Sequence, residues 1–290
     1  MKIKAFIVTC ILILGIVSNA NAEYDFNKYI LKAVDTLNKG DAHKGYDINS
    51  YFTKEINYGS EKIKSNNSPK TMCVAAVAET IITAINLYSE ETKDVTVYEK
   101  LPSGTWNKTS RLMLRPYIFQ LKHVSSKGTG EALKIYGLGK ELQFSELKAG
   151  DFITYSRTNK TGHAAVFLDF LDKDGKAVNY SADKVVGFKY FSAQGKGKSY
   201  GGLYTRNGYF DGFCPTPRGR DDDCNIIKRR YLNMGRMYHP KDWQVESSVA
   251  ILKNSVVSSL RGRGIDDANK IQNELQKEFV MNVDERFTGE

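Results

Sequence analysis

Cys73 and His163 are the two residues of this 290-residue chain whose types and surroundings best suit covalent chemistry. Cys73 stands near the start of a strongly apolar stretch, residues 68–87, which predicts a helix buried in the middle of a domain. A thiol at the N-terminal end of such a helix feels the positive end of the helix dipole, which favours thiolate over thiol. His163 opens an apolar run typical of a strand, and its imidazole could take the thiol proton there.

Three further residues are candidates to complete a site. An imidazole that acts as a base needs a polar group to orient it, and Ser192 and Gln194 fall opposite His163, on one face of the next long predicted strand. The amide of Asn67, six positions before Cys73, could join the backbone N–H of the cysteine in binding an oxyanion. Each also has a plainer interpretation, as a solvent-facing strand end or a turn residue.

Cys73 also has a plainer interpretation, because free cysteine is among the residue types most often buried. The cysteine count weighs against it. Cys214 and Cys224 bracket a short polar loop and are expected to form a disulfide in an oxidising compartment. Cys73 is then the unpaired thiol of an exported chain, which calls for a functional reason. His163 could likewise be a strand-end residue that only hydrogen-bonds the backbone.

Residues 1–22 predict a cleavable secretory leader, with Lys2 and Lys4 at its charged start, an apolar run, and Ala-Asn-Ala at 20–22 as the cleavage site. The mature protein is expected in a periplasm or outside the cell. No integral membrane segment is expected, because the leader is short for a span and no later stretch is long enough. Removing two lysines lowers the formal net charge from +9 to +7, which favours anionic partners such as cell-wall polymer. No nucleic-acid partner is expected, because no compact basic run interleaved with aromatics occurs.

The rest of the chain predicts one α+β domain over 23–245, followed by a helical extension over 246–290. Amphipathic spacing indicates a helix that ends at Gly40, and after the apolar helix two more at 111–122 and 131–136. The pattern then changes to period two. This change indicates strands at 152–157, 163–171, 185–194 and 203–213, with another between 226 and 243.

Three other patterns in the chain partly match motifs that bind a cofactor or a metal. The glycine pairs at 128–130 and 137–139 follow no predicted strand, so they do not make a dinucleotide-binding motif. The acidic run at 221–223 lacks the spacing of a calcium loop, and the histidines and cysteines lack zinc spacing. No cofactor and no metal are expected.

The order of these motifs resembles the papain-like cell-wall hydrolases, namely the NlpC-type endopeptidases and CHAP amidases. In that family a cysteine heads a buried helix, a Leu-x-x-Gly-Asp turn (here Leu147 to Asp151) opens the sheet, and Gly-His-small-x-Val starts the next strand. The match covers residues 66–210. It implies a papain-like (NlpC-type) fold, in which N-terminal helices and a buried cysteine-bearing helix pack on an antiparallel sheet. Cys73 matches the nucleophile and His163 the base.

The resemblance implies a secreted cysteine peptidase or amidase that cleaves amide bonds in peptidoglycan stem peptides. The Cys73 thiolate would attack the carbonyl, and His163 would protonate the leaving amine and then activate water. The third residue of the family is His, Asn or Asp, whereas this chain has Ser192 or Gln194 there. The expected partners are peptidoglycan or a peptide substrate and an inhibitor or immunity protein. Two alternatives stay open: a degenerate hydrolase fold that binds the wall or a partner protein, and an acyltransferase with the same Cys–His pair.

Overall fold

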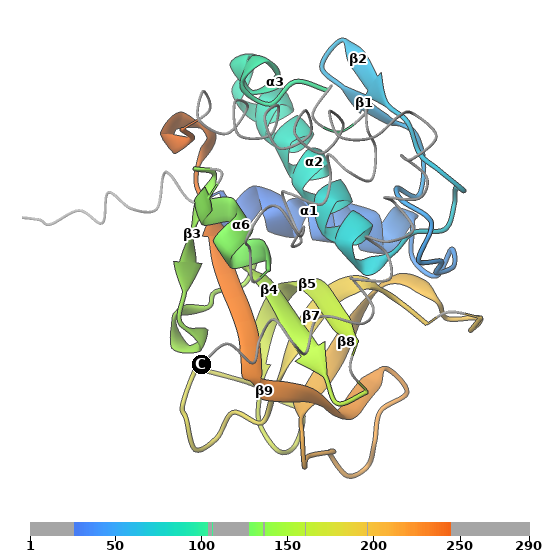
Figure 1. Ribbon diagram of the computed structural model, residues 1–290, viewed down its shortest axis with the longest axis vertical. Coiled ribbons are helices and arrows are strands. Elements are labelled where there is room, and N and C mark those ends of the chain that lie inside the picture. Colours follow the sequence, from blue (N-terminus) through green and yellow to red (C-terminus); the bar gives the residue numbers. More distant parts are fainter. Residues whose placement is uncertain are drawn as a thin grey trace, which may run out of the picture.

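The architecture is a group of helices packed on a strongly curved sheet (Figure 1). A computed structural model describes residues 26–103, 106, 128–135, 137–159, 161–195 and 197–244. The helices come before the strands of the large sheet, so the predicted α+β class is confirmed. The predicted leader, the predicted helix at 111–122 and the C-terminal extension lie outside the described residues. Within the described ranges, no helix combines the length and hydropathy that a membrane span requires.

Two long helices form the N-terminal layer. Helix α1, Asn27–Gly40, is amphipathic, and its apolar positions at three- and four-residue spacing are buried. Helix α2, Cys73–Thr92, is apolar on most faces and lies in the middle of the core. The expected helix start before Cys73 is wrong, because Met72 is extended and is the N-cap. The Ser68 hydroxyl, which lies before the helix, donates to the carbonyl of Thr53 at 2.6 Å.

Shorter elements complete this half. A small hairpin of β1, Ile56–Tyr58, and β2, Glu61–Ile63, lies between α1 and α2, where the sequence pattern indicates no strand. Helix α3 spans Thr96–Lys100, and α6, Thr129–Ile135, confirms the short helix expected at 131–136. Two 3₁₀ turns occur at Phe144–Glu146 and Pro240–Asp242.

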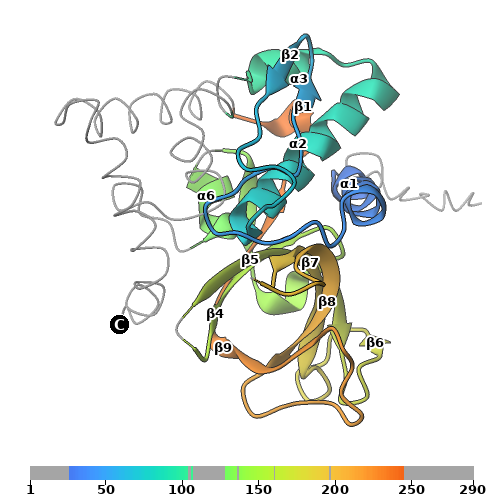
Figure 2. The ribbon, with the colours of Figure 1, turned by 90° about the vertical axis from the view of Figure 1, so that its right-hand side faces the viewer.

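The second half is a sheet with the order β3-β9-β4-β5-β7-β8. Its strands are β3 Gly139–Leu142, β4 Phe152–Arg157, β5 Gly162–Leu171, β7 Gly187–Gln194, β8 Gly202–Phe210 and β9 Asp222–Met237, with the short β6, Ala177–Val178, beside β5. The pairs in this order are antiparallel, as expected. A further pairing of β8 with β9 is parallel and closes five strands into a barrel (Figure 2).

Alternate residues of the barrel strands enter two separate cores. Ala164 and Val166 of β5 lie in the core beneath the helices, together with α2. Ala165 and Phe167 of the same strand lie in the core inside the barrel. The position of a residue along β5 therefore decides whether its side chain faces α2 or the barrel interior.

The turn over Leu147 to Asp151, part of the motif that carries the resemblance, is a structural junction. The Asp151 carboxylate is fully buried and accepts hydrogen bonds from the Asn27 amide at 2.7 Å and the Lys148 backbone N–H at 2.8 Å. Arg236 binds both carboxylate oxygens, at 2.7 and 2.6 Å. This buried, fully paired carboxylate joins α1, the start of β4 and β9.

Candidate functional site

Cys73 is the first residue of α2, and α2 packs on β5 and β7 of the barrel. Burial raises the pKa of the Cys73 thiol, since only 1% of the residue is exposed. The backbone N–H of Ala164, the Arg157 side chain and the N–H groups of Val74 and Cys73 itself oppose that rise. The helix start thus points hydrogen-bond donors at the sulfur, as the sequence predicts, but desolvation outweighs them.

Tyr46 lies near enough to the same thiol to interact with it electrostatically. Its segment is held in place by backbone hydrogen bonds from Thr71 to Gly45 at 3.3 Å and from Gly45 to Gly201 at 2.9 Å. Burial raises the pKa of Tyr46, and the nearby Cys73 thiol adds to the rise. The sulfur is therefore buried, with Tyr46 among the groups near it.

The expected contact between the His163 ring and the Cys73 sulfur is not present in this structure. The ring lies inside the barrel, with its centroid 5.3 Å from the Tyr155 ring and 5.7 Å from the Tyr190 ring. Ala164, the next residue along β5, is the one that faces α2. Because successive side chains of a strand point to opposite faces, His163 and Cys73 lie on opposite sides of the sheet.

His163 is also electrostatically unsuited to accept a proton. Burial, and then the charges of Arg157 and Arg206, hold the pKa of His163 far below its usual range, so the ring is neutral at neutral pH. Its Nε2 is buried and has no hydrogen-bond partner among the described residues.

Ser192 and Gln194 do share the barrel-interior face with His163, as predicted, but neither is hydrogen-bonded to its ring. The Ser192 hydroxyl donates to the backbone carbonyl of Ala164 at 2.6 Å. The Gln194 amide oxygen accepts from Arg157, and its nitrogen donates to Asp223 at 2.6 Å. Both side chains are therefore hydrogen-bonded to other residues of the barrel.

Asn67 does not reach the sulfur. It is exposed, and its amide nitrogen donates to the Ser50 hydroxyl at 2.7 Å. Its backbone φ of 63° is the left-handed conformation that asparagine tolerates in turns, which agrees with the plainer interpretation as a turn residue. The expected disulfide between Cys214 and Cys224 is confirmed, and Cys73 is a free, buried thiol.

Arg157 is a site residue that the sequence analysis missed. It ends β4, beside the first residues of β5, and it interacts electrostatically with both Cys73 and His163. Burial opposes its charge, but the neighbouring Tyr155 and Tyr190 raise the pKa of Arg157, which therefore stays protonated. The sequence did contain a signal for Arg157. This residue ends the predicted strand that precedes His163, and a cation at the end of that strand can lie close to a thiol at the start of the helix packed on the sheet.

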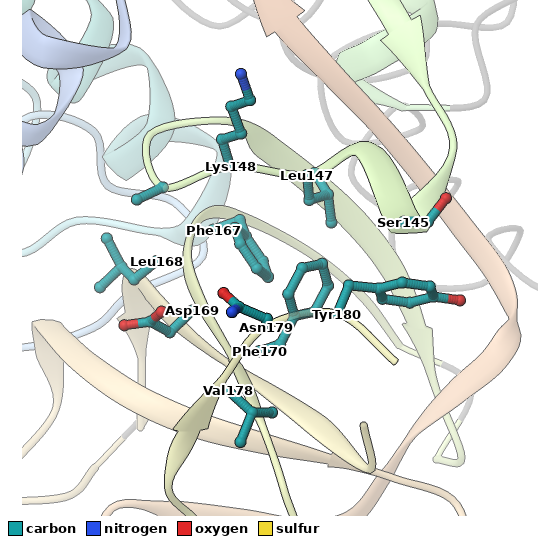
Figure 3. A pocket seen from close by; sticks show the side chains of 11 residues that line it. Ser145, Leu147, Lys148, Phe167, Leu168, Asp169, Phe170, Val178, Asn179 and Tyr180 are labelled. Atoms are coloured by element: carbon teal, nitrogen blue, oxygen red, sulfur yellow. The ribbon is translucent and has the colours of Figure 1, made fainter. Parts of the chain in front are cut away.

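A hollow of about 280 Å³ opens beside the C-terminal half of β5, where Phe167 to Phe170 line it (Figure 3). Phe170 packs against Phe167 and Tyr180, with ring centroids 4.7 and 5.3 Å apart. Tyr180 is one of the few large apolar side chains with substantial exposure, at 39%. Asp169 and Asn179 add polar groups to the lining of the hollow, and Lys148 lies at its edge.

These polar side-chain groups are available to bind a ligand. Among the described residues, no hydrogen bond or ion pair involves the Asp169 carboxylate, the Asn179 amide or the Lys148 ammonium group. The hollow combines aromatic rings with a mostly polar accessible lining, and its volume lies just below the ~300–1,000 Å³ typical of small-ligand sites. Within the same described ranges, no cluster of metal-binding side chains occurs.

Comparison of the chain with family models, with curated proteins and with solved structures finds no match. The evidence for a function is therefore the geometry of the thiol, the barrel and the hollow.

Proposed function

We propose that this protein is a binding module that acts outside the cell and holds one unit of a cell-wall polymer in the hollow beside β5. The observation that carries the proposal is that one hollow is lined by the exposed Tyr180 ring and by the Asp169 and Asn179 side chains, which make no hydrogen bond or ion pair among the described residues. An aromatic ring packs on the apolar face of a sugar, while a carboxylate and an amide hydrogen-bond its hydroxyl and acetamido groups. The disulfide and the basic net charge are compatible with a role at an anionic wall.

The thiol site supports this reading over catalysis. A cysteine hydrolase needs a base at the sulfur and a path for the substrate. Here the Cys73 thiol is enclosed and its pKa is raised, while His163 faces the barrel interior. The architecture, a cysteine-headed helix on a barrel, would then be that of a hydrolase-like fold used for binding.

Binding to purified, insoluble peptidoglycan tests the proposal. Tyr180→Ala is expected to weaken binding by about tenfold, because exposed tyrosines are common binding hot spots. Asp169→Asn in the same hollow should also weaken it. Tyr200→Ala is the matched control, since Tyr200 is equally exposed at 39% and lies outside the hollow. Equal binding by wild type and Tyr180→Ala would exclude the hollow as the binding site.

The second candidate is the cysteine hydrolase that cleaves amide bonds in stem peptides. It is favoured by the N–H groups and the Arg157 charge, which oppose the rise that burial causes in the pKa of the Cys73 thiol. Digestion of muropeptides by wild type and by Cys73→Ala, read by mass, separates the two. Cleavage by wild type alone, with rapid alkylation of the thiol by iodoacetamide below neutral pH, would establish the hydrolase. A binding module leaves the muropeptides intact with both proteins.

A further inference from the structure

The barrel mouth nearest Cys73 carries a cluster of charged and polar side chains that packing alone does not explain. Arg157 from β4, His163 from β5 and Arg206 from β8 converge there, and both arginines influence the His163 ring electrostatically. The rings of Tyr155 and Tyr190 pack against the His163 ring. His163 and Arg206 are almost completely buried, at 1% and 3% exposure.

Three nitrogen atoms of this cluster are buried without a hydrogen-bond partner among the described residues. They are Nε of Arg157, Nη1 of Arg206 and Nε2 of His163. Each arginine is already held by one other hydrogen bond, Arg157 by the Gln194 amide oxygen and Arg206 by the Tyr200 carbonyl at 3.1 Å. The guanidinium groups are thus fixed in place while one donor of each stays unused, and buried unused donors are costly.

The charges at the mouth do not balance. Among the described residues, neither Arg157 nor Arg206 forms an ion pair with a carboxylate. Asp223 acts electrostatically on Arg157, and one oxygen of its carboxylate is engaged by Tyr190 and Gln194. His163 adds no charge, because burial and the arginines keep it neutral, yet its Nε2–H tautomer can donate. A buried site with excess positive charge and free donors is stabilised by an anion.

We propose that this mouth binds a small oxyanion, a carboxylate or a phosphate group, between Arg157, Arg206 and His163. The oxygens of such a group accept from the three unused nitrogens and offset the excess charge. Barrel mouths are common ligand sites, and Arg is the residue that most often recognises carboxylate and phosphate groups. This site lies at the opposite end of β5 from the hollow and is independent of it.

The adjacent thiol provides an internal reporter. Arg157 lowers the pKa of Cys73, so an anion bound to Arg157 would weaken that effect. Alkylation of Cys73 by iodoacetamide at alkaline pH should therefore slow when the anion binds, although the anion does not touch the sulfur.

Isothermal titration of the full chain with inorganic phosphate and with acetate, at constant ionic strength, tests the proposal. We expect saturable binding of at least one of them, with Arg206→Gln weakening it by about tenfold. Arg220→Gln is the control, because Arg220 is highly exposed and pairs with Asp221. Phosphate without acetate binding, or the reverse, identifies the preferred oxyanion.

A second measurement uses only wild-type protein, so it does not depend on whether a variant folds. Titration of wild-type protein with the same anion should shift the ring signals of His163 in NMR spectra and slow Cys73 alkylation over the same concentration range. If neither anion binds, or if Arg206→Gln and Arg220→Gln bind as wild type does, or if the His163 signals stay unchanged while an anion binds elsewhere, the proposal is wrong. None of these outcomes bears on wall binding at the hollow.

Discussion

Glu79 is an ionisable residue in the middle of the apolar helix α2, with no exposed surface. Its carboxylate accepts hydrogen bonds from the Thr53 backbone N–H at 2.9 and 3.2 Å and from the Thr53 hydroxyl at 2.6 Å. Burial raises the pKa of Glu79 from 4.5 to about 7, although the hydrogen bonds from Thr53 oppose the rise. The side chain joins α2 to the segment that precedes β1. Ionisation strengthens the hydrogen bonds from Thr53, but the cost of burying the charge is larger, so the folded protein favours the protonated form.

This pKa predicts how stability depends on pH. Between pH 4.5 and about 7 the folded protein holds a proton that the unfolded chain releases. The contribution of Glu79 to stability is thus full below pH 4.5 and is lost as pH rises through 7. The loss is about 1.4 kcal/mol per pH unit, or about 3 kcal/mol over the window. Urea unfolding of Glu79→Gln should lack this loss, because the amide keeps the shape and an acceptor without ionising.

Glu90→Gln is the control for that measurement, since Glu90 lies on the same helix and is exposed. It should keep the wild-type decline in stability between pH 4.5 and 7. If Glu79→Gln shows the same decline as wild type and Glu90→Gln, the buried carboxyl is not its source.

The residues of the candidate site were partly predictable from the sequence. Cys73 does head the buried helix, and Ser192 and Gln194 do share a face with His163. The face itself was not predictable, because the run that starts at His163 is apolar at both alternating sets of positions. From such a pattern, either alternating set of β5 side chains could face α2. In the structure Ala164 faces the helix, and the larger imidazole lies inside the barrel.

At the scale of the elements, α6 packs on β9 through a glycine contact. A Cβ on Gly130 would lie 2.0 Å from the Met234 carbonyl oxygen, and a Cβ on Gly235 would lie 2.4 Å from the Gly130 Cα. The obstacles are backbone atoms, which cannot rotate away. The helix can therefore approach the strand this closely only because neither position carries a side chain.

Gly130→Ala should therefore lower the free energy of unfolding by about 1–3 kcal/mol, as expected for overpacking in a well-ordered region. Chemical denaturation followed by circular dichroism measures the change. Gly40→Ala is the matched control, because a Cβ there meets no atom within 4 Å, and it should leave stability unchanged or slightly higher. Equal stabilities of Gly130→Ala and Gly40→Ala would mean that α6 and β9 separate without cost.

The sequence predicted the long elements better than their assembly. Strong periodicity marked α1, β4, β5 and β7, and each lies close to where it was expected. The β1–β2 hairpin was missed because strands of three residues are too short to show alternation. The closure of the barrel was missed because it depends on a parallel pairing of β8 with β9, and nothing within either strand specifies that partner.

At the scale of the whole molecule, the two proposed sites use opposite ends of the same strand. The hollow involves Phe167 and Phe170 near the end of β5, whereas the barrel mouth involves His163 near its start. The barrel core between them is filled by aromatic and aliphatic side chains. A substitution at one end should leave the other intact, because residues that are far apart and share no partners act additively.

Closure of the barrel also depends on the connection between β8 and β9. The disulfide joins Cys214, in this connection, to Cys224, ten residues later and within the first residues of β9, and the parallel β8–β9 pairing lies beside it. In the unfolded chain the bond removes the conformational freedom of a short loop, and in the folded chain it limits how far the two strands can separate.

The double variant Cys214→Ala/Cys224→Ala should lose roughly 2–3 kcal/mol of unfolding free energy, the value that loop entropy gives for a loop of this length. Urea unfolding with and without a reductant measures it. Reductant should lower the stability of wild type and of Cys73→Ala, which both keep the disulfide, and should not change the double variant. A reductant effect of the same size in the double variant would show that the disulfide does not stabilise the closed barrel, and closure would then rest on the β8–β9 pairing and the barrel core alone.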